Sequence, residues 1–322
     1  MRGCISFEKE IDAMSKTRVF IDGSAGTTGL RINERLAGRD DIELITLNEG
    51  ERKKDSARKE AIFSSDITFL CLPDDAARQA AELSEGSGAT IIDASTAHRT
   101  LPDWAYGFAE LGSAFHEKIA TSKRIAVPGC HASGFIALVY PLIETGLIDD
   151  DALLTCHSLT GYSGGGKKMI AQYEGGNDPL LKAPRQYGIG QTHKHLGEMR
   201  AVTGIKNEPI FCPIVADFYS GMEVTVPLFK AQIKGDIQDI KNVYAKKYTG
   251  AIVHFDEAAD ENGFLSAGKL SGRDDMSVSV YGNDERILLT ARYDNLGKGA
   301  SGAAIECMNI SMGIEPKTGL NL

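Results

Sequence analysis

The chain has 322 residues, of which 42% are hydrophobic and 25% are charged, and its formal net charge is −9 at pH 7. This length allows about two domains with separate cores, and the composition is that of a globular protein. The acidic total lacks the basic footprint of a nucleic-acid-binding protein, and no apolar run approaches the roughly 20 residues of a membrane span. We therefore expect neither nucleic acid nor a membrane as a partner.

Residues 1–16 carry charges of both signs and no sustained apolar face. They lack the apolar centre of a secretion signal, and Glu8, Glu10 and Asp12 argue against an organelle transit peptide. We expect a disordered extension here, and Met14 offers an alternative start of the chain.

The six cysteines are scattered and form no Cys-x-x-Cys pair. This spacing argues against a zinc ribbon and against a disulfide scaffold, and it fits a reducing compartment. We expect a cytoplasmic protein without a metal site.

Short apolar runs alternate with helical stretches over the first part of the chain. The run 18–22 predicts a buried strand, a glycine-rich turn follows, and a helix continues to Leu36. Further strands are expected at 42–47, 67–72, 90–93 and 125–127. This alternation predicts a Rossmann-type, doubly wound parallel sheet.

The turn after the first strand has the spacing Gly-x-x-Gly-x-x-Gly. Its residues are Gly23, Ser24, Ala25, Gly26, Thr27, Thr28 and Gly29. Glycines between a strand and a helix let the backbone approach a pyrophosphate, which the free amides of the helix start can bind. We expect a dinucleotide site here, although a turn without a ligand would show the same pattern.

The second predicted strand ends at Leu47-Asn48-Glu49, and Arg52, Lys53 and Lys54 follow. An acidic residue at this point favours NAD because it binds the ribose hydroxyls, whereas cations suit the 2′-phosphate of NADP. We expect NADP, while these charges could equally belong to a solvated loop.

Cys130 differs from the other cysteines in its surroundings. It follows Pro128-Gly129 and opens a predicted helix, and a helix N-terminus favours a thiolate. A helix end contributes only about 0.3–1 kcal/mol, however, while lowering a thiol pKa by two units requires about 2.7 kcal/mol. A nearby cation or base must therefore assist, and His131 is a poor candidate because adjacent helical residues point in different directions.

The segment 191–198 offers better partners for the cysteine, because His193 and His195 flank Lys194. A solvated basic turn is the alternative, and a zinc site would lack a third ligand nearby. The loop 159–168 is rich in glycine and contains Ser163 and two lysines. It presents backbone donors that suit an anion, although a surface turn looks the same.

The second half of the chain changes in pattern. Residues 222–228 alternate between apolar and polar, and 276–281 and 286–291 flank a hairpin turn. We expect an α+β domain on a largely antiparallel sheet, followed by a helical tail from Lys298 to Gly313.

These motifs, in this order, resemble the shorter form of the N-acetyl-γ-glutamyl-phosphate reductases of arginine biosynthesis. The resemblance runs from about Thr17 to Gly313, with the glycine loop as cofactor loop and Pro128-Gly129-Cys130 as nucleophile motif. His131-Ala132-Ser133 departs from the Tyr-Pro-Thr of the longer form, and Gly197 replaces its proline after the histidine pair. These departures fit the shorter form, and they mean that the resemblance does not fix the residues of the substrate pocket.

The resemblance implies that NADPH reduces an acyl phosphate, N-acetyl-γ-glutamyl phosphate, to the semialdehyde through a thioester on Cys130. It favours His193 over His195 as the residue that handles the proton. Further cofactor contacts are expected from Ser95, Ser163, Gly164 and Asn295. Substrate contacts are expected from Arg99 and His195, and also, on charge and location alone, from Lys182, Arg185 and Lys194.

The related fold also implies that the C-terminal helix returns to the cofactor domain and that the enzyme is a homodimer or homotetramer. We expect an NADP-binding domain of residues 17–130 and 296–322, and a catalytic and dimerisation domain of residues 131–295. Three alternatives remain, namely another acyl phosphate such as aspartyl or aminoadipyl phosphate, a Cys-His hydrolase or acyltransferase, and a non-catalytic NADP sensor.

Overall fold

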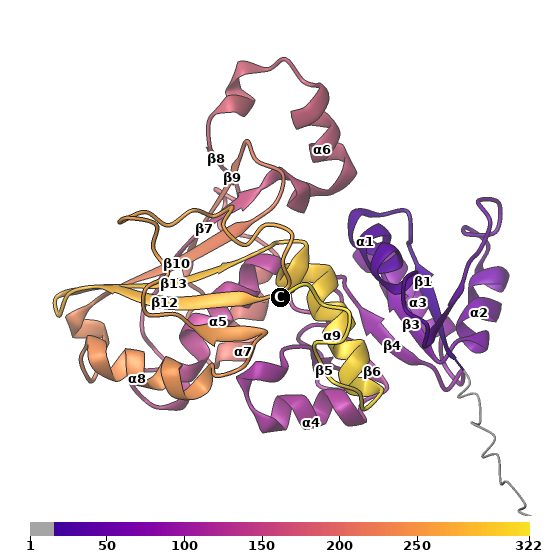
Figure 1. Ribbon diagram of the computed structural model, residues 1–322, viewed down its shortest axis with the longest axis horizontal. Coiled ribbons are helices and arrows are strands. Elements are labelled where there is room, and N and C mark those ends of the chain that lie inside the picture. The colour runs from indigo at the N-terminus through magenta and orange to yellow at the C-terminus, as the bar shows by residue number, and fades with distance from the viewer. Residues whose placement is uncertain (1–15) are drawn as a thin grey trace, which may run out of the picture.

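A computed structural model describes residues 16–322, so the expected extension over residues 1–16 lies outside the described residues except for Lys16. Two sheets stand side by side, and the C-terminal helix α9 (Gly302–Ser311) lies between them (Figure 1).

The first sheet is parallel throughout and has the strand order β2-β1-β3-β4-β6-β5. Its strands are β1 (Thr17–Asp22), β2 (Ile42–Ile45), β3 (Ile67–Leu70), β4 (Thr90–Asp93), β5 (Ala105–Tyr106) and β6 (Arg124–Ala126). The helices around it are α1 (Thr27–Leu36), α2 (Asp55–Ser64), α3 (Asp74–Leu83) and α4 (Ser113–Thr121). The predicted Rossmann-type sheet is therefore confirmed, and its order reverses between β1 and β3.

Both faces of this sheet are buried, because successive strand residues point to opposite sides. Val19 and Ile21 pack in one cluster with residues of α1 and α9, whereas Phe20 packs with residues of α2 and α3. This explains why the strands are apolar without alternation.

The second sheet is mixed, with the order β11-β12-β13-β10-β7-β9-β8. Its strands are β7 (Thr155–Gly161), β8 (Arg185–Gln186), β9 (Ile210–Ala216), β10 (Met222–Phe229), β11 (Val253–Phe255), β12 (Met276–Gly282) and β13 (Arg286–Tyr293). Only the pairs β11–β12 and β7–β9 are parallel. The largely antiparallel sheet and the β12–β13 hairpin are as predicted.

Helices cover one face of this sheet (Figure 1). They are α5 (Cys130–Glu144), α7 (His195–Thr203) and α8 (Ile237–Lys247). Val224, Val226 and Leu228 of β10 join the core beneath these helices, while Glu223 and Thr225 point to the other face and are half-buried. The alternation along β10 thus reflects one face that packs on helices and one that does not.

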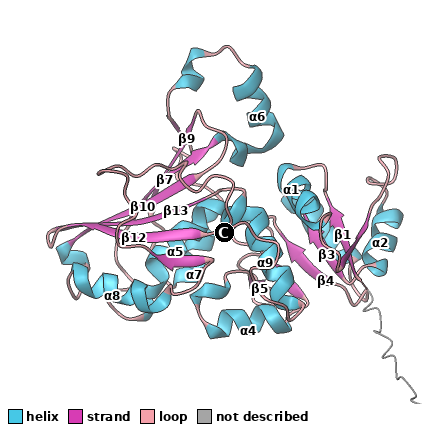
Figure 2. Cartoon of the chain, in the orientation of Figure 1, coloured by secondary structure: helices cyan, strands magenta, loops and turns pink. Residues whose placement is uncertain are grey.

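Helix α6 (Gly166–Gly175) belongs to a segment that projects away from both sheets (Figure 2). The short helical turns are η1 (Ala109–Leu111), η2 (Tyr162–Gly165), η3 (Pro179–Lys182), η4 (Lys230–Gln232) and the π-turn η5 (Gly297–Ser301). The predicted helical tail is confirmed as η5 followed by α9, and Ala304 and Met308 of α9 pack against the first sheet.

Candidate active site

A cavity of about 440 Å³ lies where the two sheets meet. The glycine loop lines one side, the start of α5 lines another, and residues from the segments 160–166, 193–195, 295–296 and 299–300 complete the wall. The cavity also reaches Cys71 and Leu72, which follow β3. It therefore lies at the carboxyl ends of β1 and β3, the switch point at which doubly wound sheets bind their ligands.

The glycine loop is shaped by close backbone contacts. Gly23 has φ of +89°, and a Cβ there would lie 2.3 Å from the Cys71 carbonyl oxygen. A Cβ at Gly29 would lie 2.5 Å from the Gly23 carbonyl oxygen. Only glycine fits both positions, and the resulting tight turn brings the start of α1 to the cavity.

The start of α1 fits the pyrophosphate of a dinucleotide. Gly26, Thr27 and Thr28 line the cavity, and no side chain caps the first turn of the helix. Its first amides can therefore bind an anion. Gly23, Ser24 and Ala25 form the turn before the helix, and Gly29 lies in its first turn.

Across the cavity, the loop containing Ser163 faces the glycine loop. A Cβ at Gly166 would lie 3.8 Å from Thr27 Oγ1, and Ser163 and Gly164 line the cavity. The Asn295 side chain joins this loop to its surroundings: Nδ2 donates to Ser163 Oγ at 3.0 Å, and Oδ1 accepts from the Gly221 amide at 2.9 Å. Three of the expected cofactor residues thus share one wall.

Ser95, the fourth expected cofactor residue, stands behind the cavity wall. Its hydroxyl donates to Asp93 Oδ2 at 2.7 Å, and His98 Nδ1 lies 2.6 Å from the same oxygen. Its neighbour Ala94 lines the cavity. Ser95 therefore braces the loop that carries Ala94 and Arg99.

Cys130 is the first residue of α5, and the predicted helix start is confirmed. Its side chain is half-buried and lines the cavity. Burial raises the pKa of the Cys130 thiol above its ordinary value, while the Arg99 charge and the His131 backbone amide lower it. Arg99, with a smaller contribution from Lys194, is thus a nearby cation of the kind expected to assist the helix N-terminus, and it offsets part of the effect of burial.

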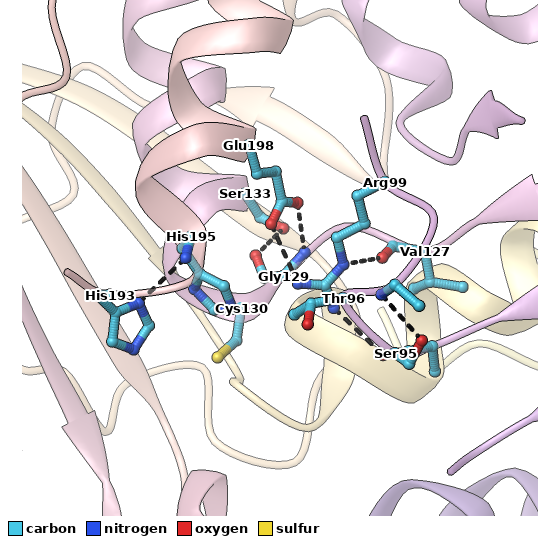
Figure 3. Close-up of polar contacts among 12 residues, drawn as sticks. Ser95, Thr96, Arg99, Val127, Gly129, Cys130, Ser133, His193, His195 and Glu198 are labelled. Atoms are coloured by element: carbon cyan, nitrogen blue, oxygen red, sulfur yellow. Dashed lines mark hydrogen bonds and ion pairs between the residues drawn. The ribbon is translucent and has the colours of Figure 1, made fainter. Parts of the chain in front are cut away.

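Arg99 is held by a buried network that also holds the nucleophile. Its Nε donates to the Val127 carbonyl at 2.8 Å, and Nη1 donates to Glu198 Oε2 at 3.0 Å. The other carboxylate oxygen, Glu198 Oε1, accepts from the Gly129 amide at 2.8 Å (Figure 3). It also accepts from the Tyr106 hydroxyl at 2.7 Å. Glu198 thus ties the N-cap of α5 to the cation.

Sequence reasoning gave no role to Glu198 or Tyr106. One signal was available, because Glu198 lies three residues after His195 on α7, and residues at this spacing share a helix face. His195 lies on that face too: a Cβ at Gly129 would be 2.6 Å from His195 Nε2 and 2.8 Å from Glu198 Oε2.

His193 and His195 both line the cavity, but their rings are held differently. His193 Nδ1 accepts a hydrogen bond from the His195 backbone amide at 3.2 Å (Figure 3). A neutral His193 ring therefore carries its proton on Nε2. His195 is buried, and its Nδ1 has no hydrogen-bond partner among the described residues.

Both histidines favour the neutral form. Burial and the nearby Lys194 lower the pKa of His193. Burial and the Arg99 charge lower the pKa of His195 well below its ordinary value. His193 thus presents a neutral N–H donor and not a resting imidazolium.

The His131 ring lines the same cavity as Cys130, but both of its nitrogens are engaged by other residues. Its Nδ1 lies 2.7 Å from Ser158 Oγ and its Nε2 lies 2.6 Å from the Tyr187 hydroxyl. Burial lowers the pKa of His131 to about 3, so the ring stays neutral and serves to position Tyr187, which lines the cavity.

Lys182 and Arg185 are carried by the segment after α6 and lie outside the cavity wall. Lys182 is exposed and pairs with Asp217 at 2.8 Å, and Arg185 Nη2 donates to the Tyr173 hydroxyl at 2.9 Å. Lys194, in contrast, lines the cavity. Arg52, Lys53 and Lys54 also lie outside the wall, in the turn after β2.

Within residues 16–322, no cluster of three His, Cys, Asp or Glu side chains could hold a metal ion. The same residues contain no helix with the length and apolar character needed to cross a membrane.

Comparisons with known proteins agree with this architecture. Residues 18–120 match the family described as "Semialdehyde dehydrogenase, NAD binding domain", and residues 130–295 match "Semialdehyde dehydrogenase, dimerisation domain". Over 309 residues the chain is 43% identical to the N-acetyl-gamma-glutamyl-phosphate reductases of Brucella ovis and Brucella canis, covering 92% of this chain and 99% of each relative.

Solved structures of lower identity share the fold. Aspartate semialdehyde dehydrogenase II from Vibrio cholerae, complexed with ASA, has a TM-score of 0.71 at 16% identity and covers 93% of this chain and 99% of its own. Aspartate semialdehyde dehydrogenase from Francisella tularensis has a TM-score of 0.69 at 14% identity, covering 91% and 99%.

Proposed function

The chain belongs to the N-acetyl-γ-glutamyl-phosphate reductase family, and on that basis we propose how its residues carry out the family's reaction. The enzyme reduces N-acetyl-γ-glutamyl phosphate to N-acetylglutamate 5-semialdehyde and phosphate with NADPH, a step of arginine biosynthesis. The observation that supports this most strongly is Cys130 at the start of α5, in one cavity with the glycine loop and His193.

Cys130 is the nucleophile. Its sulfur attacks the acyl carbon, and the bond between that carbon and the phosphate oxygen breaks, so that phosphate leaves with the bonding electrons. The product is a thioester, which divides one difficult reduction into two easier steps. Arg99 and the His131 amide favour the thiolate that this attack needs.

NADPH, when bound, supplies a hydride to the thioester carbon. The carbonyl oxygen then carries negative charge until the carbon–sulfur bond breaks, which releases the aldehyde and returns the electron pair to Cys130. A hydrogen-bond donor at this oxygen stabilises the negative charge that develops during hydride transfer, and the Nε2 proton of a neutral His193 is such a donor. We assign His193 to this oxygen, and His195, Arg99 and Lys194 to the substrate.

The cofactor is NADP. For its pyrophosphate we propose the glycine loop and the start of α1, with Ser163, Gly164 and Asn295 toward the nicotinamide. For the 2′-phosphate we propose Arg52, Lys53 and Lys54. Arg52 Nε donates to the Leu47 carbonyl at 3.1 Å, which holds this side chain near the end of β2.

We propose residues 17–130 and 296–322 as the cofactor domain and 131–295 as the catalytic and dimerisation domain. Packing of α9 on the first sheet supports this division. The match of residues 130–295 to a dimerisation domain indicates an oligomer, and we propose a homodimer or homotetramer that uses the helix-free face of the second sheet. We also propose a cytoplasmic location, supported by five free cysteines among the described residues.

The test runs the reaction backwards, because the aldehyde is more stable than the acyl phosphate. Purified protein is mixed with N-acetylglutamate semialdehyde, phosphate and NADP, and NADPH absorbance is followed. We expect phosphate-dependent NADPH formation that Cys130→Ser abolishes. Activity on aspartate semialdehyde alone would keep the reaction type but identify aspartyl phosphate as the substrate. Inactivity on every aldehyde despite NADP binding would refute the reductase function.

A further inference from the structure

Behind the wall that faces Cys130 lies a buried cluster of three charged side chains. Lys298 is only 2% exposed, and its Nζ lies 2.7 Å from Glu110 Oε1 and 2.5 Å from Glu306 Oε2. The three residues come from η5, η1 and α9, so the cluster joins the turn after the second sheet to two elements of the cofactor domain.

The residue that follows Lys298 in the chain lies against the nucleophile. Gly299 follows Lys298 in η5 and lines the cavity with Leu296 and Ala300. A Cβ at Gly299 would lie 3.1 Å from the Cys130 Cβ. Any shift of Lys298 therefore moves the wall that faces Cys130.

Charge balance requires a proton in this cluster. Two carboxylates and one ammonium would leave a net negative charge in a buried site, which is costly unless one group is neutral. The charged groups beside Glu306 are Lys298 and Glu110, and its chain neighbour Cys307 directs its thiol to the Gly107 carbonyl at 3.5 Å. No second cation is therefore present among the neighbours of Glu306 to balance the second carboxylate, and Lys246 and Lys247 of α8 lie with Glu110 along a surface pocket on its other side.

We propose that Lys298 is a positioning residue for the nucleophile, and that a proton on Glu306 keeps η5 packed against Cys130. When Glu306 is neutral, Lys298 and Glu110 form a balanced pair, and Glu306 holds the ammonium by a hydrogen bond. When Glu306 ionises, the buried site becomes negative, its packing loosens, and the cavity wall moves relative to Cys130. This role rests on the proposed function only where turnover is the readout.

The direction of the pH effect follows from the burial of Glu306. Burial raises the pKa of Glu306 from 4.5 to about 8, and the neighbouring Glu110 adds to the rise. The carboxyl group is thus protonated at neutral pH and loses its proton above about pH 8. Glutamine has the shape of the protonated acid and does not ionise. Glu306→Gln therefore keeps the cluster in the state in which Lys298 and Glu110 balance each other's charge at every pH.

The experiment measures kcat and KM from pH 6.5 to 9.5 for the wild type, Glu306→Gln, Lys298→Met and Arg39→Met. Arg39 is the matched control, because it is a largely buried cation that anchors the same helix through Asn309 at 2.7 Å. The ratio of each variant's kcat to that of the wild type cancels every other ionisation. Alkylation of Cys130 by iodoacetamide, followed on its peptide, provides a readout without substrate.

We expect the Glu306→Gln ratio to rise at least threefold between pH 7 and 9.5, while the Arg39→Met ratio stays flat. Lys298→Met should lower kcat at least tenfold with little change in KM, and should slow Cys130 alkylation. A flat Glu306→Gln ratio would overturn the proposal, and so would a wild-type kcat in Lys298→Met. If Lys298→Met does not fold, Glu306→Gln decides alone. If the wild type reduces no acyl phosphate, the rate of Cys130 alkylation, measured for the same variants over the same pH range, tests the proposal instead.

Discussion

Glu198 Oε1 accepts a hydrogen bond from the Gly129 backbone amide at 2.8 Å. Gly129 is the N-cap of α5, so this bond fixes the turn from which Cys130 projects. The other oxygen of the same carboxylate pairs with Arg99, the cation that favours the thiolate. One buried side chain therefore fixes the position of the nucleophile and holds the cation beside it, while its own charge adds to the rise of the Cys130 pKa.

Glu198→Gln should lower kcat about 100-fold, because misplacement of a reacting group by about 1 Å costs that much. The amide would present N–H groups to Arg99 or to the Gly129 amide, which both require an acceptor. Glu208→Gln is the control, since Glu208 forms an exposed ion pair with Arg200 at 3.8 Å. Steady-state kinetics of the reverse reaction measure both variants, and a wild-type kcat in Glu198→Gln would contradict this role.

His193 offers a matched pair of substitutions. The amide nitrogen of glutamine reaches the place of Nε2, whereas that of asparagine reaches only the place of Nδ1. If the donor at Nε2 stabilises the oxyanion, His193→Asn should lose about 10²–10³-fold in kcat, and His193→Gln should lose clearly less. Equal loss in both variants would instead favour proton transfer by the imidazole ring.

The cofactor turn can be tested at Gly23. Gly23→Ala would strain a residue at φ of +89° and place Cβ 2.3 Å from a carbonyl oxygen, and each 1.4 kcal/mol lost in binding weakens affinity tenfold. We expect NADP to bind at least tenfold more weakly by fluorescence titration. Gly38→Ala is the control, because a Cβ there meets nothing within 4 Å. Unchanged NADP affinity in Gly23→Ala would contradict the assignment of this loop to the cofactor site.

Local patterns were sufficient to predict several parts of this structure. Pro128-Gly129 before an apolar run indicated the helix that Cys130 begins, and the segment 282–285 indicated the β12–β13 hairpin. In these places, backbone preference and periodicity act over a few residues and depend little on the rest of the fold.

The network around Cys130 could not be predicted in the same way. Glu198 meets Tyr106 and Arg99 across sequence separations of 92 and 99 residues, and no local pattern encodes such contacts. Lys182 shows the reverse case: its charge suggested an anion site, but the chain carries it away from the cavity to Asp217. Charge along a sequence does not reveal which element will carry a side chain.

The cluster around Lys298 also predicts how stability depends on pH. Glu306 has a folded pKa of about 8 against an ordinary value of 4.5. A raised pKa in the folded state means that stability is fully present below about pH 4.5 and is lost as pH rises through about 8. Relative to Glu306→Gln, the wild type should lose on the order of 4 kcal/mol of unfolding free energy over this window. Urea denaturation at pH 5, 6.5 and 8 measures the difference, and a pH-independent difference would contradict the raised pKa.

The thioester on Cys130 is tested most directly in the absence of phosphate. Enzyme mixed with N-acetylglutamate semialdehyde and NADP should form one NADPH per site in a single burst and then stop, because the acyl group has no acceptor. The Cys130 peptide should then gain the mass of one N-acetylglutamyl group, and added phosphate should restart NADPH formation. Cys130→Ser should show neither burst nor mass change. A burst that survives this substitution, or an acyl group attached elsewhere, would contradict the central claim.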